Sequence, residues 1–305
     1  MKVLVTGGTG FVGQAVLAAL REAGHPARVL VRDASSPHAR ELVARLSAEA
    51  VVGDVLDPDS LRRAVPGCDA VIHLVGIISE IGRNTFENAH TTATRNVVTA
   101  AQAAGASRYV HMSALGTRPN AGSRYHQTKW AAEEIVRASG LAWTIFRPSL
   151  IFGPGDHFTR LFAALARWSP VLPVMGSGQG LLQPVAVEVV ALAFVRALTA
   201  PAAVGCTFDL CGPERVSFNH VLDAILAVTG RRRLKIHVPL ALARIQARLL
   251  EGIFPPLFGR AAPLNRDQLL MLQEDNVGDP RPANELFRLP VEPFRDGLAR
   301  YLKRP

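Results

Sequence analysis

A glycine-rich turn directly follows the first apolar segment of the chain. The segment Val3–Thr6 leads into glycines at positions 7, 10 and 13, and an Ala/Leu-rich stretch then runs to Ala23. Glycines at this spacing allow a tight turn and a close approach to a pyrophosphate, and the free N–H groups of a following helix favour an anion. The sequence therefore predicts a dinucleotide-binding turn, with a purely structural Gly-rich turn as the alternative. The candidate cofactor-binding residues of the turn are Gly7, Thr9, Gly10, Phe11, Val12 and Gly13.

Chain length and hydrophobicity limit the organisation. With 305 residues, one nucleotide-binding domain with a smaller lobe and two independent units are both compatible with the length. The 49% hydrophobic content predicts a well-filled core. Glu188 and Arg196 interrupt the most apolar stretch, Val185–Gly205, so we expect no membrane-spanning helix. Because the first strand begins at Lys2, we expect no cleaved signal sequence and a cytoplasmic protein, with a peripheral position at the inner face of the membrane as the alternative.

Cysteine and histidine spacing argues against disulfides and metals. The three cysteines, Cys68, Cys206 and Cys211, are too few for a disulfide framework. The nine histidines are not paired with cysteines or carboxylates at the spacing of zinc ligands. We therefore expect no bound metal.

The positive net charge raises the question of an acidic partner. A charge of +9 is compatible with nucleic acid, acidic lipid or a phosphorylated ligand. The dense basic cluster at 231–235 is short and contains no aromatic residue, unlike a typical nucleic-acid surface. We expect no nucleic-acid partner, and a solvated basic face accounts for the cluster.

Strand-like and helix-like segments alternate along the first half of the chain. Six strands in this order predict a doubly wound α/β fold of the Rossmann type, with a parallel sheet and helices on both faces. The predicted strands are Val3–Thr6, Arg28–Val31, Ala50–Val52, Ala70–Leu74, Arg108–Met112 and Ala142–Phe146. The predicted helices are 11–23, 38–46, 58–65, 84–104 and 123–139.

The pattern loosens after Pro148, where Gly- and Pro-rich segments at 153–155 and 176–180 interrupt it. A return to the sheet is predicted for a strand at 183–187, a helix at 189–198 and a strand at 207–210. We expect a dinucleotide-binding domain of residues 1–155, with 181–211 returning to its sheet. Residues 156–180 and 212–305 would form a smaller, mostly helical substrate or partner lobe.

A tyrosine and a lysine four residues apart are the main candidates for catalysis. Tyr125 and Lys129 would lie on one face of the helix predicted for 123–139. A phenol loses its proton near pH ~10, so it needs a nearby positive charge to act at neutral pH, and Lys129 would lower the pKa of Tyr125. Ser113, at the end of a predicted strand, could hydrogen-bond a substrate oxygen. The alternatives are an ordinary surface helix and a turn serine.

Together these features resemble the short-chain dehydrogenase/reductase superfamily over about residues 1–230. The segment Phe146–Gly155 is similar to the Arg-Pro…Gly-Pro segment of its extended, epimerase-like branch. The resemblance implies that Ser113, Tyr125 and Lys129 are catalytic. It also implies nucleotide contacts from Asp54 and Val55 at the adenine, from Leu74, Val75 and Gly76 beside the nicotinamide ribose, and from Lys129 and Pro148. His73 precedes the ribose segment, and a buried core histidine is the alternative interpretation of it.

The end of the second strand bears on the choice of cofactor. Relatives that prefer NAD carry an acidic residue there for the ribose 2′-hydroxyl, whereas this chain has Val31 followed by Arg32. A guanidinium can pair bidentately with a 2′-phosphate, so NADP(H) is the expected cofactor. NAD(H) remains the alternative, because Asp33 could serve the 2′-hydroxyl if the strand ends one residue later.

A smaller group within the superfamily is also similar, namely the NADPH-binding accessory subunits of respiratory complex I and their bacterial homologues. The similar segments are 111–116, 125–130, 151–158, 264–272 and 275–277. In that group the nucleotide can be a structural element that is not turned over, although the intact Tyr125/Lys129 pair favours catalysis here. Two functions therefore remain open: an NADP(H)-dependent oxidoreductase or epimerase, and a non-turnover structural or assembly factor of a respiratory or quinone-related membrane system.

Residues 240–258 combine an apolar stripe with arginines. The stripe recurs at helical spacing and consists of Leu242, Ile245, Leu249 and Ile253, while residues 244 and 248 are arginines outside it. This pattern is typical of a basic amphipathic helix at a membrane surface. It predicts a contact with a membrane or membrane complex and suits a lipophilic small-molecule substrate. The alternative is a helix that packs its Leu/Ile side on the substrate lobe.

Overall fold

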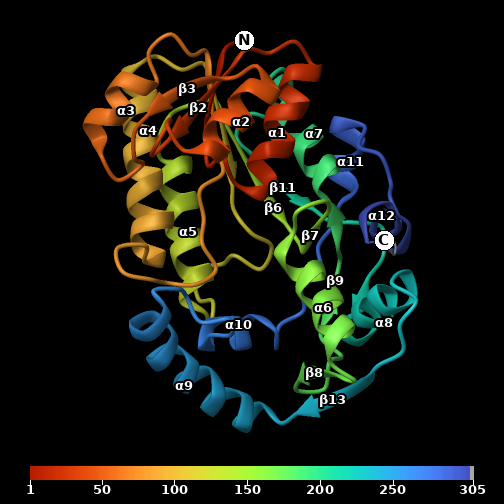
Figure 1. The fold of residues 1–305 in the computed structure, drawn as a ribbon. Coiled ribbons are helices and arrows are strands. Elements are labelled where there is room, and N and C mark those ends of the chain that lie inside the picture. Colours follow the sequence, from red (N-terminus) through yellow and green to blue (C-terminus); the bar gives the residue numbers. More distant parts are fainter. Residues whose placement is uncertain (303–305) are drawn as a thin grey trace.

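Seven parallel strands form the central sheet of the computed structural model, which describes residues 1–302 (Figure 1). The strands are β1 (Val3–Thr6), β2 (Ala27–Val31), β3 (Glu49–Val52), β4 (Ala70–His73), β5 (Arg108–Met112), β6 (Trp143–Pro148) and β11 (Cys206–Leu210). Their order is β11-β6-β5-β4-β1-β2-β3. The direction of winding reverses between β1 and β4, which is where open α/β sheets bind nucleotides.

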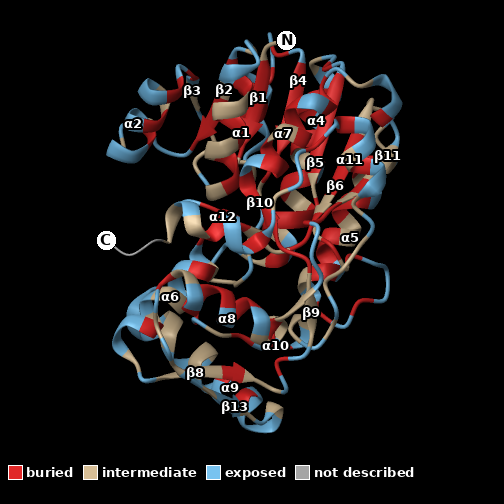
Figure 2. Cartoon of the chain, turned by 90° about the vertical axis from the view of Figure 1, so that its right-hand side faces the viewer, coloured by how far each residue is buried: buried red, intermediate tan, exposed pale blue. Residues whose placement is uncertain are grey.

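Helices cover both faces of this sheet. One face packs against α1 (Phe11–Glu22), α2 (Pro37–Leu46), α7 (Val187–Ala197) and α11 (Arg281–Phe287). The other packs against α3 (Pro58–Ala64), α4 (Ala93–Ala103) and α5 (Arg124–Arg137). Because side chains alternate along a strand, Val3 and Val5 enter the first core and Leu4 the second, and all three are fully buried. Figure 2 shows the resulting band of buried residues along the sheet. The doubly wound α/β prediction is confirmed.

A second group of elements lies beyond the C-terminal ends of the strands (Figure 1). Its helices are α6 (His157–Trp168), α8 (Phe218–Val228), α9 (Leu240–Phe258), α10 (Arg266–Met271) and α12 (Phe294–Tyr301). Its short strands pair as β8 (Val171–Met175) with β13 (Leu234–Val238) and β9 (Leu181–Leu182) with β12 (Val216–Ser217). A separate small core joins α6, β8 and α8. The mostly helical character of this region was expected, and the domain boundaries themselves stay a prediction.

Two local expectations differ from the structure. The strand predicted at 183–187 is reduced to β10 (Val185–Ala186), which pairs with β7 (Ile151–Phe152) outside the main sheet, so only β11 joins that sheet. The helix predicted at 84–104 begins with a π-helical stretch, Glu87–Thr92, before α4. Such wide turns re-aim side chains and often occur at functional sites. Across residues 1–302, no helix is both long and apolar enough to cross a membrane.

Candidate active site

The glycine turn forms a cradle at the point where the winding reverses. Gly7 has a φ of +78°, and its oxygen accepts a 3.1 Å hydrogen bond from the Gly10 N–H. A Cβ on Gly13 would overlap the Gly7 carbonyl oxygen, so only glycine lets α1 start this close to the turn. A Cβ on Gly7 would lie 3.2 Å from the Leu74 carbonyl carbon and the Val75 nitrogen. The turn therefore lies directly against the segment predicted to flank the nicotinamide ribose.

The start of α1 offers main-chain donors to this crevice. Gly10 is the N-cap residue of α1 and has no side chain that could accept a hydrogen bond from the first N–H groups of the helix. A bound anion can accept those hydrogen bonds instead. The Phe11 ring packs beside Gly153, and Val12 is buried beneath the turn. His38 Nε2 lies 3.2 Å from the Thr9 oxygen and ties α2 to the turn.

The loops after β2 and β3 lie side by side. The Gly53 N–H donates to the Val31 oxygen, the last residue of β2. Asp54 Oδ1 accepts from the Leu56 N–H at 2.9 Å, which closes a tight turn that holds Asp54 and Val55 beside the crevice. The Ser60 hydroxyl of α3 accepts the Asp54 N–H, and Asn96 of α4 donates to the Val55 oxygen, each at 3.0 Å, so this pair is fixed by two helices as well as by its own turn.

Arg32 and Asp33 differ in their surroundings. Arg32 is exposed, whereas Asp33 Oδ1 accepts hydrogen bonds from the Ser35 hydroxyl and N–H at 2.6 and 2.8 Å. These bonds lower the pKa of the Asp33 carboxyl. The Asp33 carboxylate is therefore engaged in capping the loop before α2, and Arg32 follows the strand end with its guanidinium in solvent.

Lys129 is buried beside the end of β5. Its side chain is 2% exposed, and Nζ donates a 3.0 Å hydrogen bond to the Met112 oxygen. A Cβ on Gly76 would lie 2.9 Å from Nζ, so the glycine after β4 makes room for the ammonium. Burial lowers the pKa of Lys129 to about 8, although the negative charge of Glu133 opposes the shift. The structure thus brings Lys129, Gly76 and the residue before Ser113 together.

Tyr125 lies one helical turn before Lys129 in an aromatic environment. Its ring meets His90 edge-on at 5.2 Å between centroids and Phe86 at 6.0 Å. Burial raises the pKa of Tyr125 to about 12. The structure differs here from the expectation that Lys129 lowers this pKa, because the Lys129 ammonium is engaged with a main-chain oxygen and the phenol is desolvated.

Ser113 follows β5 and is buried. Its N–H donates to the Phe146 oxygen at 2.7 Å, which fixes it at the strand end. Its hydroxyl lies 3.5 Å from the Thr117 hydroxyl, which in turn lies 3.3 Å from His126 Nδ1. A chain of polar side chains therefore links Ser113 to His126, the residue after Tyr125. Pro148 is the last residue of the neighbouring strand β6, and its oxygen accepts a hydrogen bond from the Leu115 N–H.

Sequence reasoning missed His90, which supports the Tyr125 ring. Its Nε2 accepts the Ile77 N–H at 3.1 Å, so its Nδ1, 2.9 Å from the Thr128 hydroxyl, carries the proton in the neutral tautomer. Burial, reinforced by the charge of Lys129, lowers the pKa of His90 to about 2. The residue lies in the π-helical stretch, and no spacing in the sequence could have singled it out.

His73 belongs to the core rather than to the cofactor surface. It is fully buried at the end of β4, with Nδ1 2.6 Å from the Thr6 hydroxyl and its ring stacked on His111 at 5.5 Å. Burial lowers the pKa of His73 to about 3. The core interpretation of His73 is therefore the better one.

Residues near the C-terminus cover the start of the Tyr125 helix. Asp267 Oδ1 accepts the Arg124 N–H at 2.7 Å. Asn265 Nδ2 donates to the Ile78 oxygen and the Ser79 hydroxyl at 2.9 and 2.8 Å. Residues 265–271, called here the roof of the site, therefore cover it. They are more than a hundred residues from Tyr125 in the sequence, so no local pattern predicts this contact.

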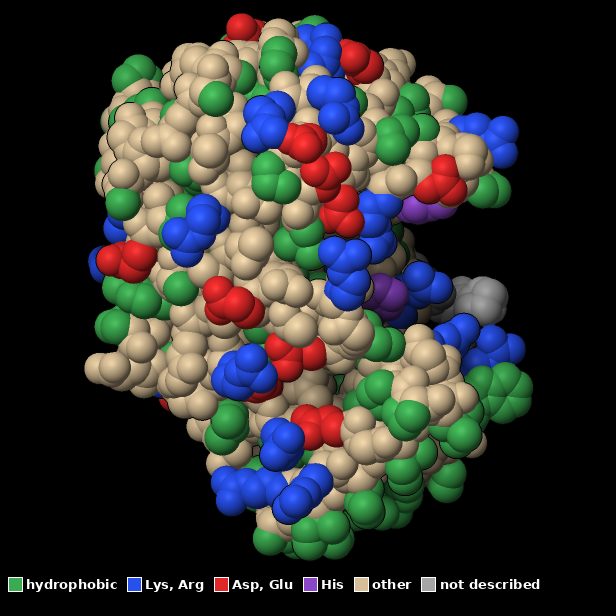
Figure 3. All heavy atoms as spheres, turned by 90° about the vertical axis from the view of Figure 1, so that its left-hand side faces the viewer, with side chains coloured by type: hydrophobic (Ala, Val, Ile, Leu, Met, Phe, Trp, Pro, Cys, Tyr) green, Lys and Arg blue, Asp and Glu red, His purple; other side chains and the backbone are tan. Residues whose placement is uncertain are grey.

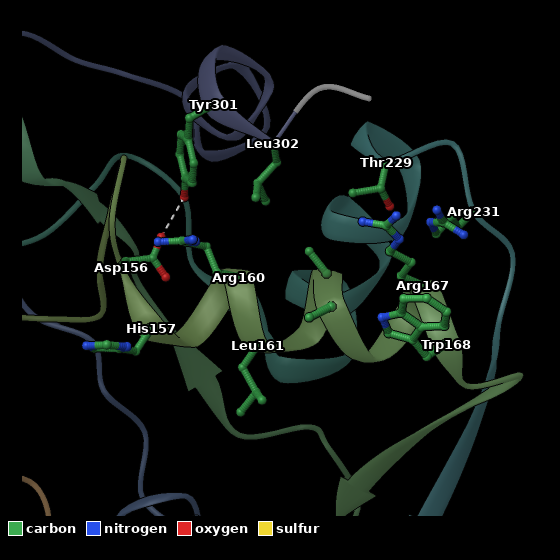
Figure 4. Close-up of a pocket in the computed structure, with 12 residues that line it drawn as sticks. Asp156, His157, Arg160, Leu161, Arg167, Trp168, Thr229, Arg231, Tyr301 and Leu302 are labelled. Carbon is green, nitrogen blue, oxygen red and sulfur yellow. Dashed lines mark hydrogen bonds between the residues drawn. The ribbon is translucent and has the colours of Figure 1, made fainter. Parts of the chain in front are cut away.

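A separate cavity lies outside this site. It has a volume of about 970 Å³ and lies between α6, the loop after α8 and the end of α12. Figure 4 shows the 2.9 Å hydrogen bond from Tyr301 to Asp156 at one end of this cavity, with Arg160 and Arg167 along α6. We place the candidate site at the glycine turn and α5, because the turn lies against the segment before Gly76 and Gly76 lies against the buried Lys129.

Comparison with known proteins identifies the family of the chain. Residues 7–157 match a family model described as NAD(P)H-binding. The chain is 39% identical over 174 residues to the ceramide reductase of Caulobacter vibrioides (57% of this chain, 53% of that protein). It is 33% identical to subunit 9 of the mouse NADH dehydrogenase [ubiquinone] 1 alpha subcomplex (77% and 63%) and 30% identical to 2-alkyl-3-oxoalkanoate reductase of Stenotrophomonas maltophilia (86% and 86%). The chain thus spans less than two thirds of the first two relatives.

A solved structure shares the whole architecture. UDP-glucose 4-epimerase from Thermotoga maritima superposes with a TM-score of 0.76 at 18% identity, covering 99% of this chain and 97% of the epimerase. At that identity the likeness concerns the fold alone.

Proposed function

The chain belongs to the NAD(P)H-binding Rossmann family that includes the extended short-chain dehydrogenases/reductases, and on that premise we propose that it is an NADP(H)-dependent reductase of a lipophilic ketone. The observation that carries the proposal is the position of Lys129 and Tyr125 on α5. Lys129 Nζ reaches the end of β5 and lies against Gly76, next to the segment that borders the glycine turn. This position supports a proton donor on α5 close to a nucleotide held at the glycine turn.

The residues at the crevice fit a dinucleotide. Gly13 lets α1 begin close to the turn. The N–H groups at the start of that helix donate to no side-chain cap within the described residues, so they suit a pyrophosphate. Arg32 would hold the 2′-phosphate, because it is exposed directly after the end of β2 and a guanidinium can pair bidentately with a phosphate. Lys129 would hold the nicotinamide ribose. When bound, NADPH supplies a hydride for the carbonyl carbon and leaves as NADP⁺.

The protein's own groups supply the proton and orient the substrate. A Tyr125 phenol whose pKa is raised to about 12 keeps its proton at neutral pH, so it is in the form that donates to a carbonyl oxygen. The Ser113 hydroxyl would donate a hydrogen bond to the same oxygen. His90 holds the Tyr125 ring from one side. The product is an alcohol, and Tyr125 regains its proton from solvent.

The roof of the site supports a lipophilic substrate. Ile78, on the loop held by Asn265, is 58% exposed at the edge of the site. Two relatives are named as reductases of a ceramide and of a 2-alkyl-3-oxoalkanoate, both of which carry hydrocarbon chains. A ketone with one or more alkyl chains is the substrate class that these observations favour.

A second candidate is a protein that holds NADPH without turnover, in a respiratory or quinone-related membrane system. One relative is a subunit of an NADH dehydrogenase. The raised pKa of Tyr125 also favours this function, because the Lys129 ammonium is engaged with the Met112 oxygen and does not activate the phenol.

NADPH oxidation with a panel of long-chain 3-oxo esters and N-acyl amino ketones tests the proposal. The Tyr125→Phe variant should bind NADPH as the original protein does, measured by quenching of NADPH fluorescence, but turn over about 100-fold or more slowly. Tight binding of NADPH with no oxidation by any panel member would favour the holding function instead. Equal turnover by the variant would rule out Tyr125 as the proton donor.

A further inference from the structure

Helix α9 has its large apolar side chains on the outside. Leu242, Ile245 and Leu249 are 57–59% exposed, whereas Ala243 and Ala247 are fully buried. The alanines pack near Leu269 of α10 and the side chains around it. The interpretation in which the Leu/Ile stripe packs on the lobe is therefore wrong, because the small alanines let α9 approach its neighbours closely with the opposite face.

The exposed stripe continues beyond the helix. On β13, Leu234 and Ile236 are 73% and 50% exposed, and they lie on the same side of the strand because side chains alternate. At the end of α9, Leu257 and Phe258 are 70% and 56% exposed. In Figure 3, apolar side chains gather along the lower edge of the molecule, the region that α9 and β13 occupy in Figure 1. An exposed apolar surface of this extent marks an interaction site.

The charges around the stripe are almost all positive. The segment 231–260 contains seven Lys and Arg residues and one acid, Glu251. Glu251 is paired with Arg266 and Lys235 with Asp223, each at 2.7 Å, so the positive charge of the segment comes from its arginines. On α9 itself, Arg244 and Arg248 are exposed beside the stripe. This complementarity favours an anionic partner surface.

We propose that the face formed by α9 and β13, called here the docking face, binds the surface of an anionic phospholipid bilayer. Its apolar stripe would enter the headgroup boundary, and its arginines would contact lipid phosphates. Arg244, Arg248 and Glu251 exclude a spanning orientation, so the helix lies in the plane of the interface. A bilayer fits better than a second protein because the stripe is long and flanked by arginines without a pattern of mixed charges.

Two contacts connect the docking face to the candidate active site. The Glu251–Arg266 pair joins α9 to α10, and Asp267 on α10 bonds to the N–H of Arg124, the residue before Tyr125. Attachment through α9 would therefore hold the roof of the site next to the membrane. The inference does not depend on turnover, because a nucleotide-holding protein would dock by the same face.

Flotation with vesicles tests the docking face. The full chain should bind vesicles of equal parts phosphatidylglycerol and phosphatidylcholine, bind phosphatidylcholine vesicles more weakly, and dissociate as salt is raised. The Ile245→Glu/Leu249→Glu variant should partition about 100-fold more weakly. The Arg244→Gln/Arg248→Gln variant should lose the preference for phosphatidylglycerol.

The matched control is Val204→Glu/Val291→Glu, which places the same charges on exposed apolar residues outside α9 and should bind as the original protein does. Unchanged NADPH affinity and melting temperature show that each variant is folded. The inference is overturned if the original protein does not bind anionic vesicles, or if the α9 variant binds them equally. It is also overturned if the protein self-associates through α9, seen as a dimer that the variant converts to a monomer without any vesicle binding.

Discussion

Lys129 Nζ donates a 3.0 Å hydrogen bond to the main-chain oxygen of Met112. This bond anchors α5 to the end of β5, so that the helix carrying Tyr125 and the strand leading to Ser113 meet at a fixed distance from the glycine turn. It also keeps a lysine in an environment that lowers its pKa to about 8. In the proposed reductase, catalysis and nucleotide binding would therefore both depend on the protonation of this buried amine.

The pH dependence of kcat/KM for NADPH should report that amine. The pKa of Lys129 is lowered, so the free protein loses the ammonium as pH rises through about 8, and kcat/KM should fall there. At mildly acidic pH the profile should be flat, because the pKa values of His73, His90 and His126 lie at about 3, 2 and 4. In Lys129→Arg the alkaline fall should disappear, since arginine keeps its charge. If kcat/KM still falls at alkaline pH in this variant, the fall reports the titration of a group other than Lys129.

Arg32 should set the preference for NADP(H). Arg32→Ala removes the guanidinium proposed to bind the 2′-phosphate, so the Kd for NADPH should rise about 10- to 100-fold while the Kd for NADH stays unchanged. Isothermal titration with both nucleotides measures this. Arg63→Ala, an exposed arginine on α3, is the matched control. Equal loss of NADH affinity would mean that Arg32 contributes general electrostatics rather than selection.

Gly13 should tolerate no side chain. In Gly13→Ala the added methyl group would overlap the Gly7 oxygen, so we expect a loss of about 1–3 kcal/mol in unfolding free energy and a loss of NADPH binding. Gly252 on α9 has open space around its Cα, and Gly252→Ala should stabilise the protein by about 0.5–1 kcal/mol. Urea unfolding compares the two. Normal NADPH binding by Gly13→Ala would contradict the cradle.

Glu133 should be a major stabilising residue of α5. Its fully buried carboxylate pairs with Arg147 and Arg137, each at 2.6 Å. Glu133→Ala leaves the partly buried Arg147 unpaired and should cost about 3–5 kcal/mol in unfolding free energy. Its neighbour Glu134 is 53% exposed, and Glu134→Ala should cost about 0.5 kcal/mol. Similar losses of unfolding free energy in the two variants would show that the buried ion pairs of Glu133 stabilise the protein no more than the exposed pair of Glu134.

The sequence predicted those parts of the candidate site whose residues are close to one another along the chain. The strand, turn and helix around Gly7–Gly13 follow from glycine chemistry and apolar periodicity, and helical spacing alone places Tyr125 and Lys129 on one face. His90 and the α10 roof depend on contacts between distant segments, which no local pattern encodes. The orientation of α9 was open for another reason: an amphipathic pattern identifies the apolar side of a helix but not whether that side faces the protein.

Transfer of deuterium from labelled NADPH tests the reductase account most directly. The protein is loaded with NADPH deuterated on the transferable position of the nicotinamide, mixed with the panel of long-chain ketones, and the products are examined by mass spectrometry. The account predicts deuterium on the carbinol carbon of at least one alcohol product, with formation slowed about 100-fold or more in Tyr125→Phe. Deuterium that stays entirely in the nucleotide with every ketone would contradict it and leave the protein as a holder of NADPH.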